Sequence, residues 1–179
     1  CDRHVREFWS AEAAQGARVA TPNAHLNALQ TMHAIHVAVT DFAMPGNPRL
    51  LNTSVGASTY GNFTNESCMI VDELDRRGLH DEARRRIELW LAYQGTVGLK
   101  GRFADIDGVF YGAGGFEQGQ SYCQHHGWVL WIIARHYRVT HDAAWLRSVS
   151  GALIKGVDWV HRQRRQTMGE QPHSRGWEH

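Results

Sequence analysis

Two stretches of the chain carry the side chains that could do chemistry. Residues 52–66 and 105–128 hold its densest mixture of amide, acidic and aromatic side chains. Amides and carboxylates bond to vicinal hydroxyl groups, and aromatic faces pack against the C–H faces of sugar rings. The two stretches therefore predict a carbohydrate site. Its candidate binding residues are Asn62, Asn65, Tyr111, Gln120, Gln124, His125 and Trp128.

Hydrolysis of a glycoside takes two carboxyl groups, of which one stays protonated to protonate the leaving oxygen. Glu117 is the first candidate for this general acid, because it lies in the glycine-rich segment 114–119 and precedes Trp128 closely. The apolar surface of an indole beside a carboxyl group would raise its pKa. The alternative interpretation of Glu117 is a solvated loop glutamate. The second carboxyl group is not identified.

The sequence predicts no metal ion and no other cofactor. Asp105 and Asp107 begin like a calcium loop, but the later ligand positions of an EF-hand are missing, so capping of a loop is favoured. His33 and His36 can share a helical face, yet no third ligand accompanies them. The three cysteines lie far apart without a Cys-x-x-Cys pair, which favours buried thiols.

Helical periodicity predicts the elements that position these residues. Thr21 and Pro22 can begin a helix that extends to about residue 40, with Leu26, Leu29 and Met32 on one face. Residues 41–58 are rich in turn formers and predict a long irregular connection. Two antiparallel helical hairpins are then expected over about 59–95 and 120–165, with their turns near Gly78 and His141.

The two predicted hairpins repeat each other. His80-Asp81 stands at the turn of the first hairpin and His141-Asp142 at the turn of the second, an offset of 61 residues (141 minus 80). A period near 60 is typical of helical-hairpin arrays, which either stack as open solenoids or close into toroids. The glycine-rich loops between the hairpins are long for a solenoid, so closure is favoured.

Several motifs resemble the bacterial six-hairpin glycosidases, which include glucoamylase-like and trehalase-like enzymes. The resemblance spans about residues 21–165 and rests on Tyr60-Gly61-Asn62-Phe63-Thr64-Asn65-Glu66, on Gly127-Trp128-Val129-Leu130-Trp131, on His136-Tyr137-Arg138-Val139-Thr140-His141-Asp142, and on Asp158-Trp159. It implies an all-α fold in which residues 1–179 form a single partial domain, about half of a six-hairpin α/α barrel. It also implies that Glu66 takes the place of an aspartate that holds substrate hydroxyls; a plain surface glutamate is the alternative.

The expected function is therefore hydrolysis of a neutral oligosaccharide or glycoside. A non-catalytic scaffold that binds a glycan or a protein is the alternative, and a lyase or epimerase on the same fold is a third, although the two stretches carry too few basic residues for acidic sugars. Nineteen basic and eighteen acidic residues leave a formal charge of +1, which indicates neither nucleic acid nor a membrane as a partner. With no signal peptide at the start, a cytoplasmic location is expected, and the open half-barrel predicts self-association.

Overall fold

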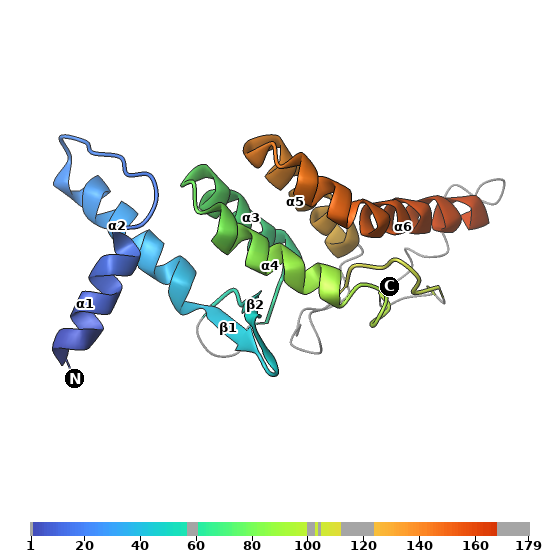
Figure 1. Cartoon of the computed structure of the whole chain (residues 1–179), viewed down its shortest axis with the longest axis horizontal. Helices are drawn as coiled ribbons and strands as arrows, with labels where there is room; N and C mark the ends of the chain where they lie inside the picture. The colour runs from blue at the N-terminus through green and yellow to red at the C-terminus, as the bar shows by residue number, and fades with distance from the viewer. Residues whose placement is uncertain (1, 57–60, 100–102, 104, 112–123, 168–179) are drawn as a thin grey trace.

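The computed structural model describes residues 2–56, 61–99, 103, 105–111 and 124–167. These residues are mostly helical, as predicted. The elements are α1 (Asp2–Ala13), α2 (Ala24–Val39), β1 (Asp41–Met44), β2 (Asn47–Thr53), α3 (Thr64–Arg76), α4 (His80–Ala92), α5 (Gln124–Thr140) and α6 (Ala143–Thr167). Figure 1 shows the helices as successive pairs along the longest axis, from α1 and α2 at one end to α6 at the other. Within the described part, no helix is long and apolar enough to cross a membrane.

The first predicted hairpin is confirmed as α3 and α4, and Gly78 makes its turn. Gly78 has a φ of +80°, a left-handed conformation that favours glycine. Its N–H donates to the Asp75 carbonyl (3.0 Å), and the next N–H, of Leu79, donates to the Leu74 carbonyl (2.9 Å). These two bonds form a Schellman motif, which satisfies the last carbonyls of α3 and reverses the chain.

The second predicted hairpin is confirmed as α5 and α6, with His141 and Asp142 at its turn. His141 has a φ of +54° and donates its N–H to the carbonyl of Tyr137 (2.8 Å). Asp142 then caps α6, because its carboxylate accepts the N–H of Trp145 at 2.9 Å. The same carboxylate pairs with Arg84 of α4 (2.9 Å), which ties the second turn to the first hairpin.

Helices α3 and α5 lie side by side and run parallel. Three contacts of increasing residue number join them: Cys68 with the Trp128 carbonyl, Asp72 with Arg135, and Asp75 with His136. The partners are separated by 60, 63 and 61 residues, so the pairing follows the predicted repeat. Adjacent hairpins in this chain are therefore related by one repeat of about 60 residues, as in a helical-hairpin array.

A fully buried contact stands at the turn end of this helix pair. The side chains of Asp75 and His136 are both 0% exposed, and the His136 Nδ1 lies 2.8 Å from one oxygen of the Asp75 carboxylate. His80 Nδ1 lies 3.0 Å from the other oxygen. The His136 ring also meets Trp145 of α6 edge to face at 4.6 Å. One carboxylate thus joins α3, α4 and α5, and a buried group of this kind must be bonded to be tolerated.

Three sequence expectations differ from the structure. Residues 41–58 are not wholly irregular, since β1 and β2 form an antiparallel hairpin in which Asp41 pairs with Thr53. Pro45-Gly46 supplies its tight turn, with Gly46 at a φ of +80°. Helix α2 begins at Ala24 and is capped by Asn23 rather than Thr21. Helix α1 was not expected, although Val5, Phe8 and Trp9 stand at helical spacing within it.

The apolar face predicted for α2 is exposed. Leu26, Leu29 and Met32 are 53%, 63% and 48% exposed, and only Val37 of this helix is buried. Helical periodicity identifies the face, but no described element covers it. An apolar surface of this size at the end of a row of helices is typical of a contact surface.

We expect the chain to self-associate through this face of α2. Replacing Leu26 and Leu29 together by glutamine should shift the population towards monomer in a sedimentation-velocity series, because two large apolar side chains leave the interface. Thr31→Gln, an exposed change on the opposite side of the same helix, serves as the control. A wild-type chain that stays monomeric over the whole concentration series contradicts the prediction.

We also expect His136→Ala to lower the free energy of unfolding by about 3 kcal/mol, because it removes the bond to Asp75 and leaves a cavity beside Trp145. His161→Ala, at an exposed position of α6, should change the free energy of unfolding little. Urea denaturation of both variants measures the difference. A loss below about 1 kcal/mol would show that the buried contact is not a main connection between the hairpins.

Candidate functional site

The candidate site lies where α3 and α5 begin. Because the two helices run parallel, their first turns lie at the same end of the pair, opposite the hairpin turns. Strand β2 leads towards the start of α3, and residues 105–111 precede the segment that leads into α5. We call the buried polar residues at this end the mouth cluster: Asn52, Asn62, Thr64, Tyr111 and His125.

The α3 side of the mouth cluster is built from amides and hydroxyls. Asn62 donates its amide N–H to the side-chain oxygen of Asn52 at 2.9 Å, and the two residues are only 1% and 2% exposed. Ser67 fixes β2 to α3 by donating its hydroxyl to the Thr53 carbonyl (3.0 Å). Within the described residues, the Asn62 Oδ1 and the Thr64 hydroxyl are buried with no hydrogen-bond partner. These two oxygen atoms could therefore accept further hydrogen bonds, for example from a hydroxyl group or a water molecule.

The α5 side of the mouth cluster is aromatic. Tyr111 and His125 are both buried, and their rings stack with centroids 5.5 Å apart at an angle of 21°. The neighbouring His126 accepts the N–H of Phe110 at Nδ1 (3.0 Å) and donates from Nε2 to the Gly156 carbonyl (2.9 Å). Burial lowers the pKa of His126, while the bond to the carbonyl opposes that shift.

Residues 105–111 are held firmly against α6. The Asp105 carboxylate pairs with Arg162 (2.7 Å) and accepts the N–H of Asp107 (3.0 Å), and its carbonyl accepts the indole N–H of Trp159 (2.7 Å). The bond from Arg162 lowers the pKa of Asp105. The predicted loop-capping role of Asp105 is therefore confirmed.

Two glycines allow this close packing. A side chain at Gly108 would collide with the backbone of Lys155, and one at Gly156 would lie 2.9 Å from the Phe110 ring. The rigid attachment to α6 fixes where the chain presents Tyr111 to His125.

The remaining candidate residues are divided between buried and accessible positions. Glu66 in the first turn of α3 and Gln124 at the start of α5 are exposed, and Asn65 and Trp128 are half-buried. The Trp128 carbonyl accepts the Cys68 thiol, and its ring meets Trp131 edge to face at 5.3 Å. Glu117 and Gln120 lie outside the described residues.

The structure thus brings Asn62 to Asn52 and Tyr111 to His125, and it sets Glu66 and Gln124 on the first turns of neighbouring helices. Asn52 and Thr64 belong to the cluster although they were not candidates. No pattern in the sequence identifies Asn52, because its contact with Asn62 depends on the path of β2.

Among the described residues, no group of three or more histidine, cysteine, aspartate or glutamate side chains could hold a metal ion. Burial raises the pKa of the Cys68 thiol well above its usual value, which keeps that thiol protonated. Comparison with protein-family models, with curated proteins and with solved structures finds no match to this chain.

The lowered pKa of His126 predicts a pH dependence of stability. Below a pH of about 6.5 the unfolded chain binds a proton at this histidine that the native state does not, so the free energy of unfolding falls as the pH decreases from about 6.5 to the native pKa. Urea denaturation at pH 7.5 and at pH 5.5 measures this loss for the wild type and for His126→Gln.

The His126→Gln variant should lose less stability than the wild type between these two pH values, whereas His161→Gln, an exposed control, should lose as much as the wild type. Equal losses in the wild type and His126→Gln would mean that His126 does not titrate differently in the two states.

Proposed function

We propose that this chain is part of a glycosidase-like helical-hairpin barrel, of which it forms about half, and that it hydrolyses a neutral oligosaccharide or glycoside. Glu117 is the proposed general acid, and the saccharide is bound at the mouth cluster and the first turns of α3 and α5. The parallel repeat of two hairpins supports the barrel, since each further repeat would add another helix that runs parallel to α3 and α5 and begins at the same end.

The contact between Tyr111 and His125 carries the proposal. Tyr111 precedes the segment that carries Glu117, and His125 follows it, and the stacked rings of these two residues lie in the mouth cluster. Glu117 stands midway in the twelve residues between Tyr111 and Gln124. Both ends of the segment that carries Glu117 therefore lie at the candidate site, which supports a role for Glu117 in catalysis there.

The site has both accessible and buried polar groups that suit the recognition of hydroxyl groups. Glu66, Gln124 and Asn65 are accessible and stand on the first turns of adjacent parallel helices, so they are the proposed contacts with the saccharide. Asn62 and Thr64, which lie close to Asn65 in the chain, are buried. Trp128 offers a half-buried ring for the C–H face of a sugar.

We expect Glu117→Gln to lower kcat by roughly 100- to 10,000-fold and to leave KM almost unchanged, because general acid catalysis acts in the transition state. Asn65→Ala should instead raise KM, since a hydroxyl contact is lost in ground and transition states alike. The assay measures release of reducing ends from a panel of neutral oligosaccharides.

Asp81→Asn, an exposed carboxyl-to-amide change at the opposite end of the hairpins, is the matched control and should retain wild-type constants. Saccharide binding without hydrolysis by the wild type would favour a non-catalytic binding scaffold. Wild-type kinetics in Glu117→Gln would remove Glu117 from the site.

A further inference from the structure

A pocket of 310 Å³ lies between the N-terminal helices and the first hairpin. Helices α1 and α2 form one side, α3 and α4 form the other, and β1 and β2 contribute Asp41 and Leu51. This volume is at the lower end of the range for small-molecule sites, roughly 300–1,000 Å³. The pocket shares no residue with the mouth cluster, so an inference about it does not depend on the proposed function.

The charges that line this pocket do not cancel. Four carboxylates and three guanidinium groups face it, which leaves one excess negative charge. Arg77 pairs with Glu73 at 2.7 Å, Arg85 pairs with Glu82 at 2.9 Å, and Arg86 pairs with Asp41. The wall formed by α3, α4 and β1 is therefore neutral as a whole.

The excess charge belongs to Glu12 on α1. Its side chain accepts a hydrogen bond from the neutral amide of Gln15 at 2.9 Å, and no ion pair of Glu12 occurs among the described residues. A half-buried carboxylate at a pocket whose other charges are already paired attracts a cation that enters from outside.

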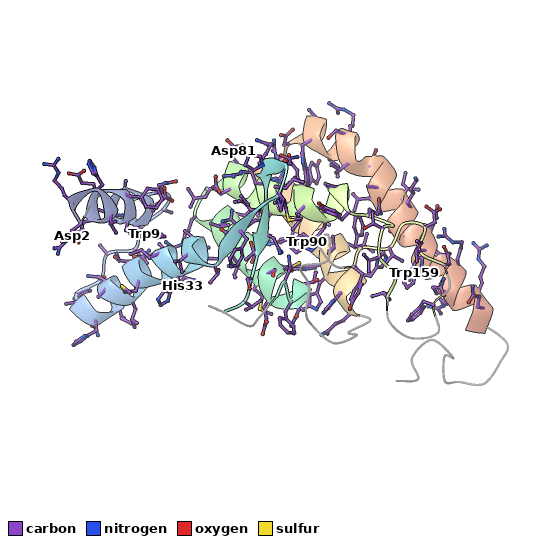
Figure 2. The ribbon with its side chains drawn as sticks, turned by 90° about the horizontal axis from the view of Figure 1, so that it is seen from below. Asp2, Trp9, His33, Asp81, Trp90 and Trp159 are labelled. Atoms are coloured by element: carbon purple, nitrogen blue, oxygen red, sulfur yellow. The ribbon has the colours of Figure 1, made fainter. Side chains whose placement is uncertain are left out.

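An aromatic pair stands one turn before Glu12. The rings of Phe8 and Trp9 meet edge to face with centroids 5.0 Å apart, and Phe8 is 55% exposed. Figure 2 shows Trp9 towards the end of α1 that lies nearer the hairpins, away from Asp2. Aromatic faces attract cations and also cover apolar groups, so they favour a ligand that has both features.

The inner side of the pocket is apolar. Small and branched aliphatic side chains from both sides line it: Ala34, Val37, Ala38, Leu51, Leu74 and Leu79. The side chains of Arg86 and Asp41 are only 4% and 8% exposed, so this part of the wall is poorly hydrated, and burial raises the pKa of Asp41 even though Arg86 opposes the shift. A ligand with a hydrocarbon or aromatic body gains free energy by displacing water from such a surface.

We propose that this pocket binds a small organic monocation, a primary ammonium group on an aromatic or aliphatic body. The ammonium group is held by the Glu12 carboxylate and the faces of Phe8 and Trp9, and the body lies against Val37 and Leu74. A neutral ligand would leave the Glu12 charge uncompensated, and an anion would be repelled by it.

The test compares three probes by isothermal titration calorimetry with the whole chain. 2-Phenylethylammonium carries both the charge and the body, 2-phenylethanol only the body, and tetramethylammonium only the charge. We expect 2-phenylethylammonium to bind at least about tenfold more tightly than either of the others, because both parts of the site must be used. An equal affinity for 2-phenylethanol, or for tetramethylammonium, would overturn the proposal.

Variants then locate the binding site. Glu12→Gln keeps the shape of the side chain and should weaken 2-phenylethylammonium binding about five- to tenfold, since a charge-assisted contact is replaced by a neutral one. Glu7→Gln is the matched control: it lies on the same helix, is 62% exposed, pairs with Arg3, and does not line the pocket. The affinity of the Glu7→Gln variant for 2-phenylethylammonium should stay within about twofold of the wild-type value.

A second variant keeps the test independent of the carboxylate. Trp9→Leu preserves apolar bulk but removes the aromatic face, and it should also weaken the affinity for 2-phenylethylammonium several-fold. Circular dichroism of each variant confirms that α1 and the rest of the helices are retained. Unchanged affinity in both Glu12→Gln and Trp9→Leu would mean that the cation binds elsewhere, which would overturn the proposal.

Discussion

The parallel register of α3 and α5 is the constraint on which the other features of this fold depend. It is fixed at the turn end by the buried contact between Asp75 and His136, which no water can replace because both side chains are fully enclosed. A shift of α5 by one turn would leave the His136 imidazole unpaired in the core and the Asp75 carboxylate with His80 alone, at a cost of several kcal/mol. The register in turn sets the first turns of both helices at one level, and the candidate site is the result.

The opposite end of the pair is organised by close packing, by hydrogen bonds and by the ion pair between Asp105 and Arg162. Residues 105–111 are pressed against α6 through two glycines, an indole N–H and the imidazole of His126. The segment is thus anchored before it reaches Tyr111. The two ends of the helix pair therefore have different roles. The contacts at the turn end align the hairpins, and the anchored segment 105–111 positions Tyr111 against His125 in the mouth cluster.

The sequence predicted the features that depend on local chemistry. Gly78 and His141 were identified as turns because the left-handed conformation after a helix and the capping aspartate are local requirements. The helical hairpins and their repeat followed from apolar periodicity. The hairpin of β1 and β2 was missed because its turn formers also suit irregular chain, and only pairing between distant residues distinguishes the two.

In the candidate site, too, features that depend on local sequence could be predicted, whereas features that depend on contacts between distant residues could not. Amide and aromatic residues could be assigned to one end of the hairpins, but the partnership of Asn52 with Asn62 depends on tertiary structure. Trp131 of α5 is 42% exposed although it is a large aromatic residue in a helix, because periodicity places a residue on a helical face without showing what covers that face. Glu12 and Trp9 belong to α1, which was not expected, and the pocket beside it depends on how α1 packs against distant parts of the chain.

Strand β2 separates the two sites with a single layer of backbone. Leu51 lines the pocket beside α1, and the next residue, Asn52, bonds to Asn62 in the mouth cluster, since successive side chains of a strand point to opposite faces. Inserting or deleting one residue in the first part of this strand would exchange the two faces, placing an amide among aliphatic groups and a leucine against an amide. Both the pocket and the mouth cluster therefore restrict the length of this short hairpin. Insertions or deletions in it should be tolerated only in steps of two residues.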